Sequence, residues 1–188
     1  MNLPNALTLS RIFLVPPLVG VLLTTTPPAR EVWGIIVFAA AATTDYFDGY
    51  LARKRSQITT LGQLLDPIAD KLLISAVFIS LVHLGIAPAW MVIIILGREF
   101  AVTGLRSIAA AQGITISAMR LGKYKMFAQV ACAGCLIVFN RLPNTLFYKV
   151  GKEVLLWVVV VLSIISMIQY FNRYWGPIQQ RVKTNRNQ

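Results

Sequence analysis

The sequence predicts an all-α polytopic membrane protein with six transmembrane helices and a short N-terminal interfacial segment. Hydrophobic residues make up 56% of the chain, and charged residues make up only 13%, against about 25% in a soluble domain. The mean hydropathy is +0.66, and apolar runs recur at lengths near the ~20 residues that a spanning helix needs. Because no linker or low-complexity segment separates these runs, residues 1–188 are expected to form one domain.

Six apolar runs are expected to span the membrane, at residues 11–26, 31–52, 66–86, 88–111, 117–139 and 150–171. The first run is short, and Pro16 and Pro17 should bend or tighten it, because proline cannot donate a helical hydrogen bond. In the third, Pro67 either begins the helix or lies inside a longer one. The last run ends in aromatic residues that are expected to lie at the membrane surface, namely Tyr170, Phe171, Tyr174 and Trp175.

Basic residues occur at alternate connections between these runs. Arg55 follows the second run, Arg120 lies near the start of the fifth, and Lys183 follows the sixth. The positive-inside rule therefore places these ends, and both termini, on the cytoplasmic side of a bacterial cytoplasmic membrane. Orientation and contact with anionic membrane lipids then explain the formal net charge of +11. Nucleic acid is not expected as a partner.

All four aspartates lie within one stretch, DYFDGYLARKRSQITTLGQLLDPIAD. Asp45 and Asp48 stand at i and i+3, and Asp66 and Asp70 at i and i+4, so each pair shares one helix face. The short basic connection predicts that the two helices are antiparallel neighbours with their acidic ends together. Carboxylates at membrane depth need a compensating charge. Two magnesium or manganese ions would balance four of them.

Small residues and a basic residue accompany the aspartates. Gly49 and Ala52 follow Asp45 by one and two helical turns and leave room for a ligand, and Gly62 does the same one turn before Asp66. Arg53 adds a guanidinium suited to phosphate. The structural alternative is a set of salt bridges between the aspartates and nearby basic residues. It leaves the small residues unexplained, and buried ion pairs are a poor source of stability.

The pattern D-x-x-D-G-x-x-A-R, eight residues, G-x-x-x-D-x-x-x-D resembles the signature of the CDP-alcohol phosphotransferase family at every specified position. The resemblance implies six transmembrane helices, a homodimer and transfer of a substituted phosphate from a CDP-linked lipid to an alcohol, with CMP leaving and two divalent cations assisting. It also implies that Asp45, Asp48, Asp66 and Asp70 are metal ligands and that Asp70 is the general base. Gly49, Arg53 and Thr59 match positions that hold the nucleotide and its phosphates.

The first residues, NLPNALTLSRI, also resemble the N-terminal segment of this family. Asn5, Thr8 and Arg11 recur at a spacing of three residues, and the functional interpretation is that they reach the diphosphate of CDP-diacylglycerol. The alternative is a short interfacial amphipathic turn.

The acceptor must be recognised by the second half of the chain. Arg98 and Arg106 lie two turns apart in the fourth run, and Lys123 and Lys125 open the fifth. Such cations suit a phosphate-bearing acceptor. GREFAVTGLRS and GKYKM resemble the bacterial branch of the family that converts glycerol 3-phosphate to phosphatidylglycerol phosphate. The alternative for Arg98 is neutralisation by Glu99 or snorkelling to the interface.

Other functions were weighed against this prediction. Within the family, inositol phosphate, serine or phosphatidylglycerol could be the acceptor. A divalent-cation transporter could also place carboxylates between helices, but it needs acidic residues along a route across the membrane, and no aspartate lies outside the cluster. A structural or lipid-binding membrane protein would not need the complete motif.

Overall fold

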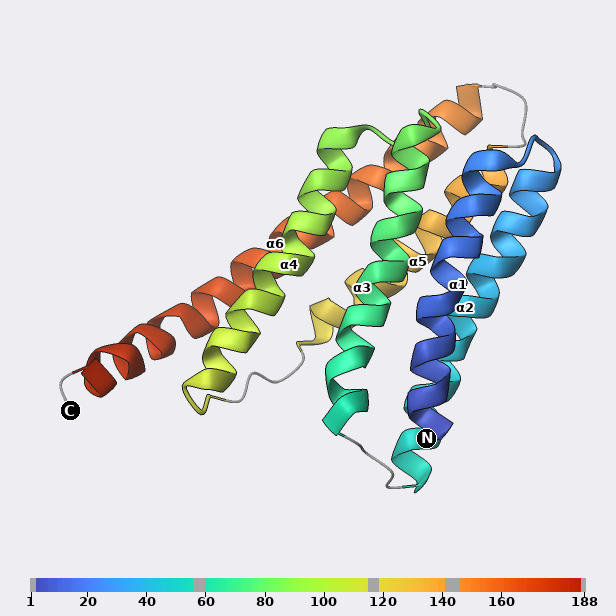
Figure 1. The fold of residues 1–188 in the computed structure, drawn as a ribbon. Coiled ribbons are helices and arrows are strands. Elements are labelled where there is room, and N and C mark those ends of the chain that lie inside the picture. The colour runs from blue at the N-terminus through green and yellow to red at the C-terminus, as the bar shows by residue number, and fades with distance from the viewer. Residues whose placement is uncertain (1–2, 56–59, 115–118, 141–145, 187–188) are drawn as a thin grey trace.

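The computed structural model of the chain describes residues 3–55, 60–114, 119–140 and 146–186. Within these ranges, only the backbone is described for residues 3–8, 45–55, 60–67 and 182–186, and for Asp70, Arg120, Lys123 and Phe147. The described residues form six α-helices, and Figure 1 shows α1 to α4 running alternately up and down. Their bounds are α1 Leu3–Thr24, α2 Ala29–Arg55, α3 Thr60–His83, α4 Ala89–Ala111, α5 Arg120–Phe139 and α6 Leu146–Arg186. The all-α, six-helix prediction is confirmed.

Helix α1 is longer than the sequence predicted, because it begins at Leu3 and contains both Pro16 and Pro17. The prediction of a separate N-terminal interfacial segment is therefore wrong. Buried residues on α1 recur every three or four positions, at Arg11, Val15, Leu18 and Leu22, so they form one face. This face packs α1 against α2 and α3.

The turn between α3 and α4 shows how the helices are terminated. Gly85 follows α3 with φ +68°, and the next amide, that of Ile86, donates to the carbonyl of Leu81 at 2.9 Å. After α4, Gly113 has φ +70°, and Ile114 donates to Ala109 at 2.8 Å. Glycine adopts this left-handed conformation without the steric cost that a Cβ would bring.

Two other helices differ from their predicted lengths. Helix α3 begins at Thr60, so Pro67 lies inside it and does not begin it. Helix α6 extends to Arg186, well beyond the predicted span of 150–171. The described basic residues that follow the sixth predicted span are therefore part of this helix.

Membrane spanning was tested on the described residues by length and hydropathy. One helix passes, over Tyr148–Arg181, with a mean hydropathy of 2.4. Shorter apolar helical stretches lie at Leu9–Thr24, Lys71–His83 and Tyr124–Phe139. The prediction of six spans is thus supported in part, by six helices of which one meets this criterion.

The described helices enclose two hydrophobic clusters. The larger one is lined by residues from all six helices, whereas the smaller one joins α4 to α6. Tyr170 and Tyr174 are buried in the smaller cluster, beside Val102 and Leu105. The prediction that these two tyrosines form part of a surface aromatic belt is therefore wrong.

Candidate functional site

The acidic motif lies at one end of the bundle. The backbone is helical at all four aspartates, with Asp45 and Asp48 on the last turns of α2 and Asp66 and Asp70 on the first turns of α3. Figure 1 shows that the end of α2 and the start of α3 lie at the same end of the molecule. Each pair keeps the spacing that puts both members on one helix face.

The side chains of this motif are outside the described residues, so metal coordination stays a prediction. The same holds for the side chains of Asn5, Thr8, Gly49, Ala52, Arg53 and Gly62, and for the whole of Thr59. Direct α2–α3 packing is not confirmed by the described contacts, in which α1 and α5 each pack against both helices. Helical backbone at every motif position nevertheless fits a pair of hard divalent cations, since it keeps the four carboxylates at one end.

Arg11 is the described residue of the N-terminal group. It is 1% exposed, on the buried face of α1. A guanidinium at this depth contradicts the interpretation of the segment as an interfacial turn, because an interfacial basic side chain would extend into water or lipid head groups. Asn5 and Thr8 precede Arg11 by two turns and one turn on the same helix.

A second polar site lies between α4, α5 and α6. Arg98 is 7% exposed and Lys125 is 2% exposed. The Nη1 atom of Arg98 donates to Oε1 of Glu99 at 3.1 Å, and the ammonium of Lys125 forms an ion pair with the same oxygen. The predicted neutralisation of Arg98 by Glu99 is thus present, but this carboxylate is shared between two cations.

Helix α6 supplies two further contacts to Arg98. Its Nη2 atom donates to Oγ of Ser166 at 2.5 Å, and its guanidinium carbon lies 5.6 Å from the centroid of the Tyr170 ring. We call Arg98, Glu99, Lys125, Ser166 and Tyr170 the Arg98 cluster. Sequence reasoning missed Ser166 and Tyr170 as site residues, because α6 carries other polar residues, such as Ser163 and Gln169, and nothing local distinguishes these two from them.

The charges of the Arg98 cluster do not balance. Among the side chains that the structure describes, the two basic groups share one carboxylate, so the formal charge of the cluster is +1. Lys71 of α3 is close enough for its own charge to act on Lys125. Among the described residues, Nε of Arg98 is buried without a hydrogen-bond partner. A surplus buried cation and an unsatisfied donor are both costly, and a bound anion would compensate them.

Of the other two predicted acceptor residues, the structure describes the side chain of Arg106 alone. Arg106 is exposed on α4, whereas Arg98 is buried. Eight residues turn an α-helix about 80° beyond two full turns, which accounts for the difference. The prediction that Arg98 and Arg106 act together is thus not supported. The side chain of Lys123 is outside the described residues, so its role stays a prediction.

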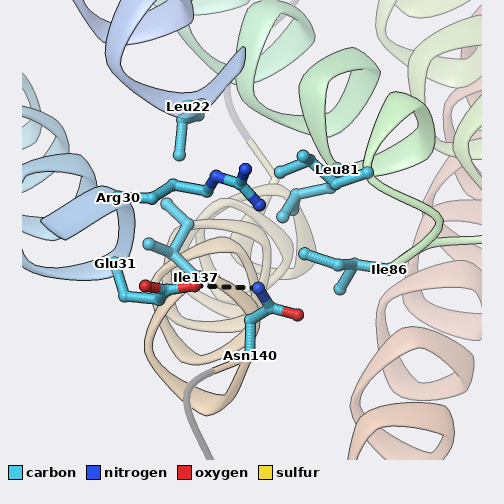
Figure 2. A pocket seen from close by; sticks show the side chains of 8 residues that line it. Leu22, Arg30, Glu31, Leu81, Ile86, Ile137 and Asn140 are labelled. Carbon is cyan, nitrogen blue, oxygen red and sulfur yellow. Dashed lines mark hydrogen bonds between the residues drawn. The ribbon is translucent and has the colours of Figure 1, made fainter. Parts of the chain in front are cut away.

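A different polar group lies where α1 ends and α2 begins (Figure 2), at the end of α2 opposite the acidic motif (Figure 1). Asn140 donates from Nδ2 to Oε1 of buried Glu31 at 2.9 Å, and Nε of Arg30 donates to the carbonyl of Thr25 at 2.9 Å. The surrounding pocket is lined mainly by Leu22, Leu81, Leu84, Ile86 and Ile137. No group of three potential metal-binding side chains occurs in the part of the chain whose side chains are described. The hydrogen bond between Asn140 and Glu31 connects the end of α5 to α2.

Comparison with known families gives a match to the CDP-alcohol phosphatidyltransferase family over residues 1–165. The CDP-diacylglycerol–glycerol-3-phosphate 3-phosphatidyltransferase of Bacillus subtilis is 43% identical, over 95% of this chain and 97% of the relative. A probable phosphatidylglycerophosphate synthase of Mycobacterium tuberculosis is 37% identical, over 92% of this chain and 81% of the relative.

A solved structure has the same fold. The crystal structure of phosphatidylinositol phosphate synthase from Mycobacterium tuberculosis, with CDP-DAG bound, matches with a TM-score of 0.63 at 22% sequence identity. The match covers 92% of this chain and 86% of that chain.

Proposed function

The chain belongs to the CDP-alcohol phosphatidyltransferase family of membrane enzymes, and from this premise we propose that it transfers a phosphatidyl group from CDP-diacylglycerol to glycerol 3-phosphate. The products are phosphatidylglycerol phosphate and CMP. Similarity at 43% identity over nearly the whole chain to an enzyme named for this reaction supports the proposal.

The acidic motif is proposed as the reaction centre. Asp45, Asp48, Asp66 and Asp70 would hold two magnesium or manganese ions, which supply charge stabilisation for an in-line displacement at phosphorus. Asp70 accepts the proton of the attacking hydroxyl as the new oxygen–phosphorus bond forms. The bond between that phosphorus and the oxygen of CMP breaks, and CMP leaves with this oxygen. A positioned general base typically contributes about 10²–10⁴-fold.

The donor lipid is proposed to lie beside this motif. Arg11 and Arg53, with Asn5 and Thr8, would bind the diphosphate, while Gly49, Ala52, Thr59 and Gly62 would give the nucleotide room and contacts. The burial of Arg11 supports a role inside the bundle. The cytoplasmic ends of the helices would let CMP reach water while the acyl chains stay in lipid. Cytoplasmic termini, a homodimer and the single domain over residues 1–188 belong to the same proposal.

The acceptor phosphate is proposed to bind the Arg98 cluster. The single observation that carries this assignment is that, among the described side chains, buried Arg98 and Lys125 share one carboxylate and Nε of Arg98 has no hydrogen-bond partner. A phosphate would supply the missing acceptor and balance the charge, which a neutral alcohol such as glycerol could not do. Inositol phosphate would satisfy the same contacts, so it is the second candidate.

The test is CMP release by purified protein from CDP-diacylglycerol, with magnesium, against a panel of acceptors. Glycerol 3-phosphate should give rapid release and a product with the mass of phosphatidylglycerol phosphate. Inositol phosphate, serine, phosphatidylglycerol and glycerol should give slow release. Release that is faster with any of these than with glycerol 3-phosphate would contradict the proposed acceptor.

A further inference from the structure

Tyr170 contacts both helices that carry the cations of the Arg98 cluster. It lies on α6 and is 4% exposed. On one side, its ring faces the guanidinium of Arg98 on α4 at 5.6 Å. On the other, its hydroxyl oxygen accepts a hydrogen bond from the backbone N–H of Met119 at 3.1 Å. Met119 is the N-cap residue of α5, the helix of Lys125.

These contacts form a closed path through three helices. From Tyr170 the path runs to Arg98, through the shared carboxylate of Glu99 to Lys125, and back along α5 to Met119 and the tyrosine hydroxyl. A closed path of contacts holds its members more firmly than separate pairs would, because one contact cannot lengthen without straining the others. The first turn of α5 also lies close, since a Cβ at Gly122 would be 3.5 Å from the hydroxyl oxygen.

The chemistry of tyrosine suits its place in this closed path of contacts. Arginine and lysine have long side chains, and holding them in one conformation costs rotamer entropy. Tyrosine has only two side-chain torsions, so it offers a rigid face to the guanidinium and a fixed acceptor to the backbone. The separation between Arg98 and Lys125 decides whether one phosphate can reach both cations. The closed path of contacts would fix this separation.

We propose that Tyr170 is a positioning residue of the acceptor site, which holds Arg98 with its ring and the start of α5 with its hydroxyl oxygen so that both cations bind one phosphate. The inference rests on the proposed function of the Arg98 cluster. It assigns no contact between Tyr170 and the substrate. Its effect is on how well the acceptor phosphate is bound, and hence on the Michaelis constant for glycerol 3-phosphate.

Two substitutions separate the two contacts. Tyr170→Phe keeps the ring and removes the hydroxyl, and it should raise the KM for glycerol 3-phosphate about 2- to 10-fold. Tyr170→Leu removes both contacts and should raise it further, with about 2- to 30-fold attributable to the ring alone. The KM for CDP-diacylglycerol should stay within about twofold of wild type in each variant, since the acidic motif is untouched. Unchanged KM values for glycerol 3-phosphate in both variants would overturn the proposal.

The matched control is Tyr174→Leu. Tyr174 is buried in the same cluster, with its ring 6.2 Å from that of Tyr170. Its loss should lower the melting temperature as much as Tyr170→Leu does, while the KM for glycerol 3-phosphate stays near wild type. An equal rise of KM in the control would overturn the proposal, because lost packing would then be a sufficient cause.

A double-mutant cycle tests whether Tyr170 acts through Arg98. In an Arg98→Ala background, Tyr170→Leu should raise the KM only by the factor of about 2 to 10 expected from loss of the hydroxyl, because the guanidinium that the ring holds is gone. Full additivity would overturn the positioning role. If Tyr170→Leu does not fold, Tyr170→Phe tests the hydroxyl contact by itself, and an unchanged KM for glycerol 3-phosphate in that variant would overturn the proposal. Failure of wild-type protein to release CMP with glycerol 3-phosphate would refute the proposed function, whereas normal wild-type activity with unaffected Tyr170 variants would refute this inference alone.

Discussion

The acidic motif and the Arg98 cluster are built in different ways. The motif takes all its carboxylates from one stretch, residues 45–70, on two consecutive helices. The Arg98 cluster takes its members from α4, α5 and α6, and the hydrogen bond between Arg98 and Ser166 joins residues 68 positions apart. Helical spacing alone therefore reveals the first site, while the second exists only after the helices pack. The two sites are also opposite in charge, which favours a division between reaction chemistry and acceptor binding.

Removal of the proposed metals should have the largest effect on turnover. It should affect the acidic motif and leave the Arg98 cluster intact. Chelation, or Asp45→Asn, Asp48→Asn or Asp66→Asn, should reduce turnover by more than about 1,000-fold, since metal ions supply several kcal/mol of charge stabilisation in phosphoryl transfer. CMP release is measured with and without added magnesium or manganese. Full turnover in excess chelator would remove the two-metal proposal.

Asp70→Asn should come next, with turnover lowered about 10²–10⁴-fold. Asparagine keeps one oxygen for a metal but cannot take the proton of the acceptor hydroxyl. Equilibrium binding of CDP-diacylglycerol should change far less than kcat, because a general base acts chiefly in the transition state. Near-normal turnover in a folded variant would show that Asp70 is not the base.

Arg98→Ala should weaken binding of the acceptor at the Arg98 cluster without affecting the acidic motif. The KM for glycerol 3-phosphate should rise about 10- to 150-fold, which corresponds to ~1.5–3 kcal/mol for a charge-assisted hydrogen bond, while the KM for CDP-diacylglycerol stays nearly unchanged. Arg98→Lys should restore only part of the binding, because an ammonium lacks the planar fork of donors. Asn140→Ala is the stability control, since it removes a buried hydrogen bond to Glu31 that lies outside both sites. If Asn140→Ala raised the acceptor KM as strongly, general destabilisation would explain the Arg98 result.

Arg106→Ala should have the smallest effect. The side chain is exposed, whereas that of Arg98 is buried, so the KM for glycerol 3-phosphate should change less than about twofold, as for most exposed residues outside a site. Steady-state kinetics of Arg106→Ala and Arg98→Ala, measured in parallel, compare their KM values for glycerol 3-phosphate. A rise as large as that of Arg98→Ala would extend the acceptor site along α4.

The sequence predicted the elements whose limits are set locally. Helix α4 was expected at 88–111 and lies at Ala89–Ala111, because an uncharged turn with Gly85 precedes it and Gly113 follows it. The ends of α1 and α6 were missed, since polar residues at Asn5 and beyond Trp175 end an apolar run without ending a helix.

The candidate site divides in the same way. The sequence placed Arg98 and Lys125 together, and the structure confirms that pair through Glu99. It also paired Arg98 with Arg106, but Arg106 is exposed whereas Arg98 is buried, so a shared role of the two stays a prediction. Ser166 and Tyr170 could not be assigned from the sequence, since nothing local shows that α6 packs against α4 at the depth of Arg98.

The central claim is that the Arg98 cluster recognises the phosphate of the acceptor, and one ratio measures it. For wild-type protein and Arg98→Ala, kcat/KM is determined for glycerol 3-phosphate and for glycerol, with CDP-diacylglycerol saturating, and the first value is divided by the second. Arg98→Ala should lower this ratio about 10- to 150-fold. Almost all of the change should come from a lower kcat/KM for glycerol 3-phosphate. A ratio that is the same in both proteins would contradict the account, because Arg98 would then not distinguish an acceptor with a phosphate from one without.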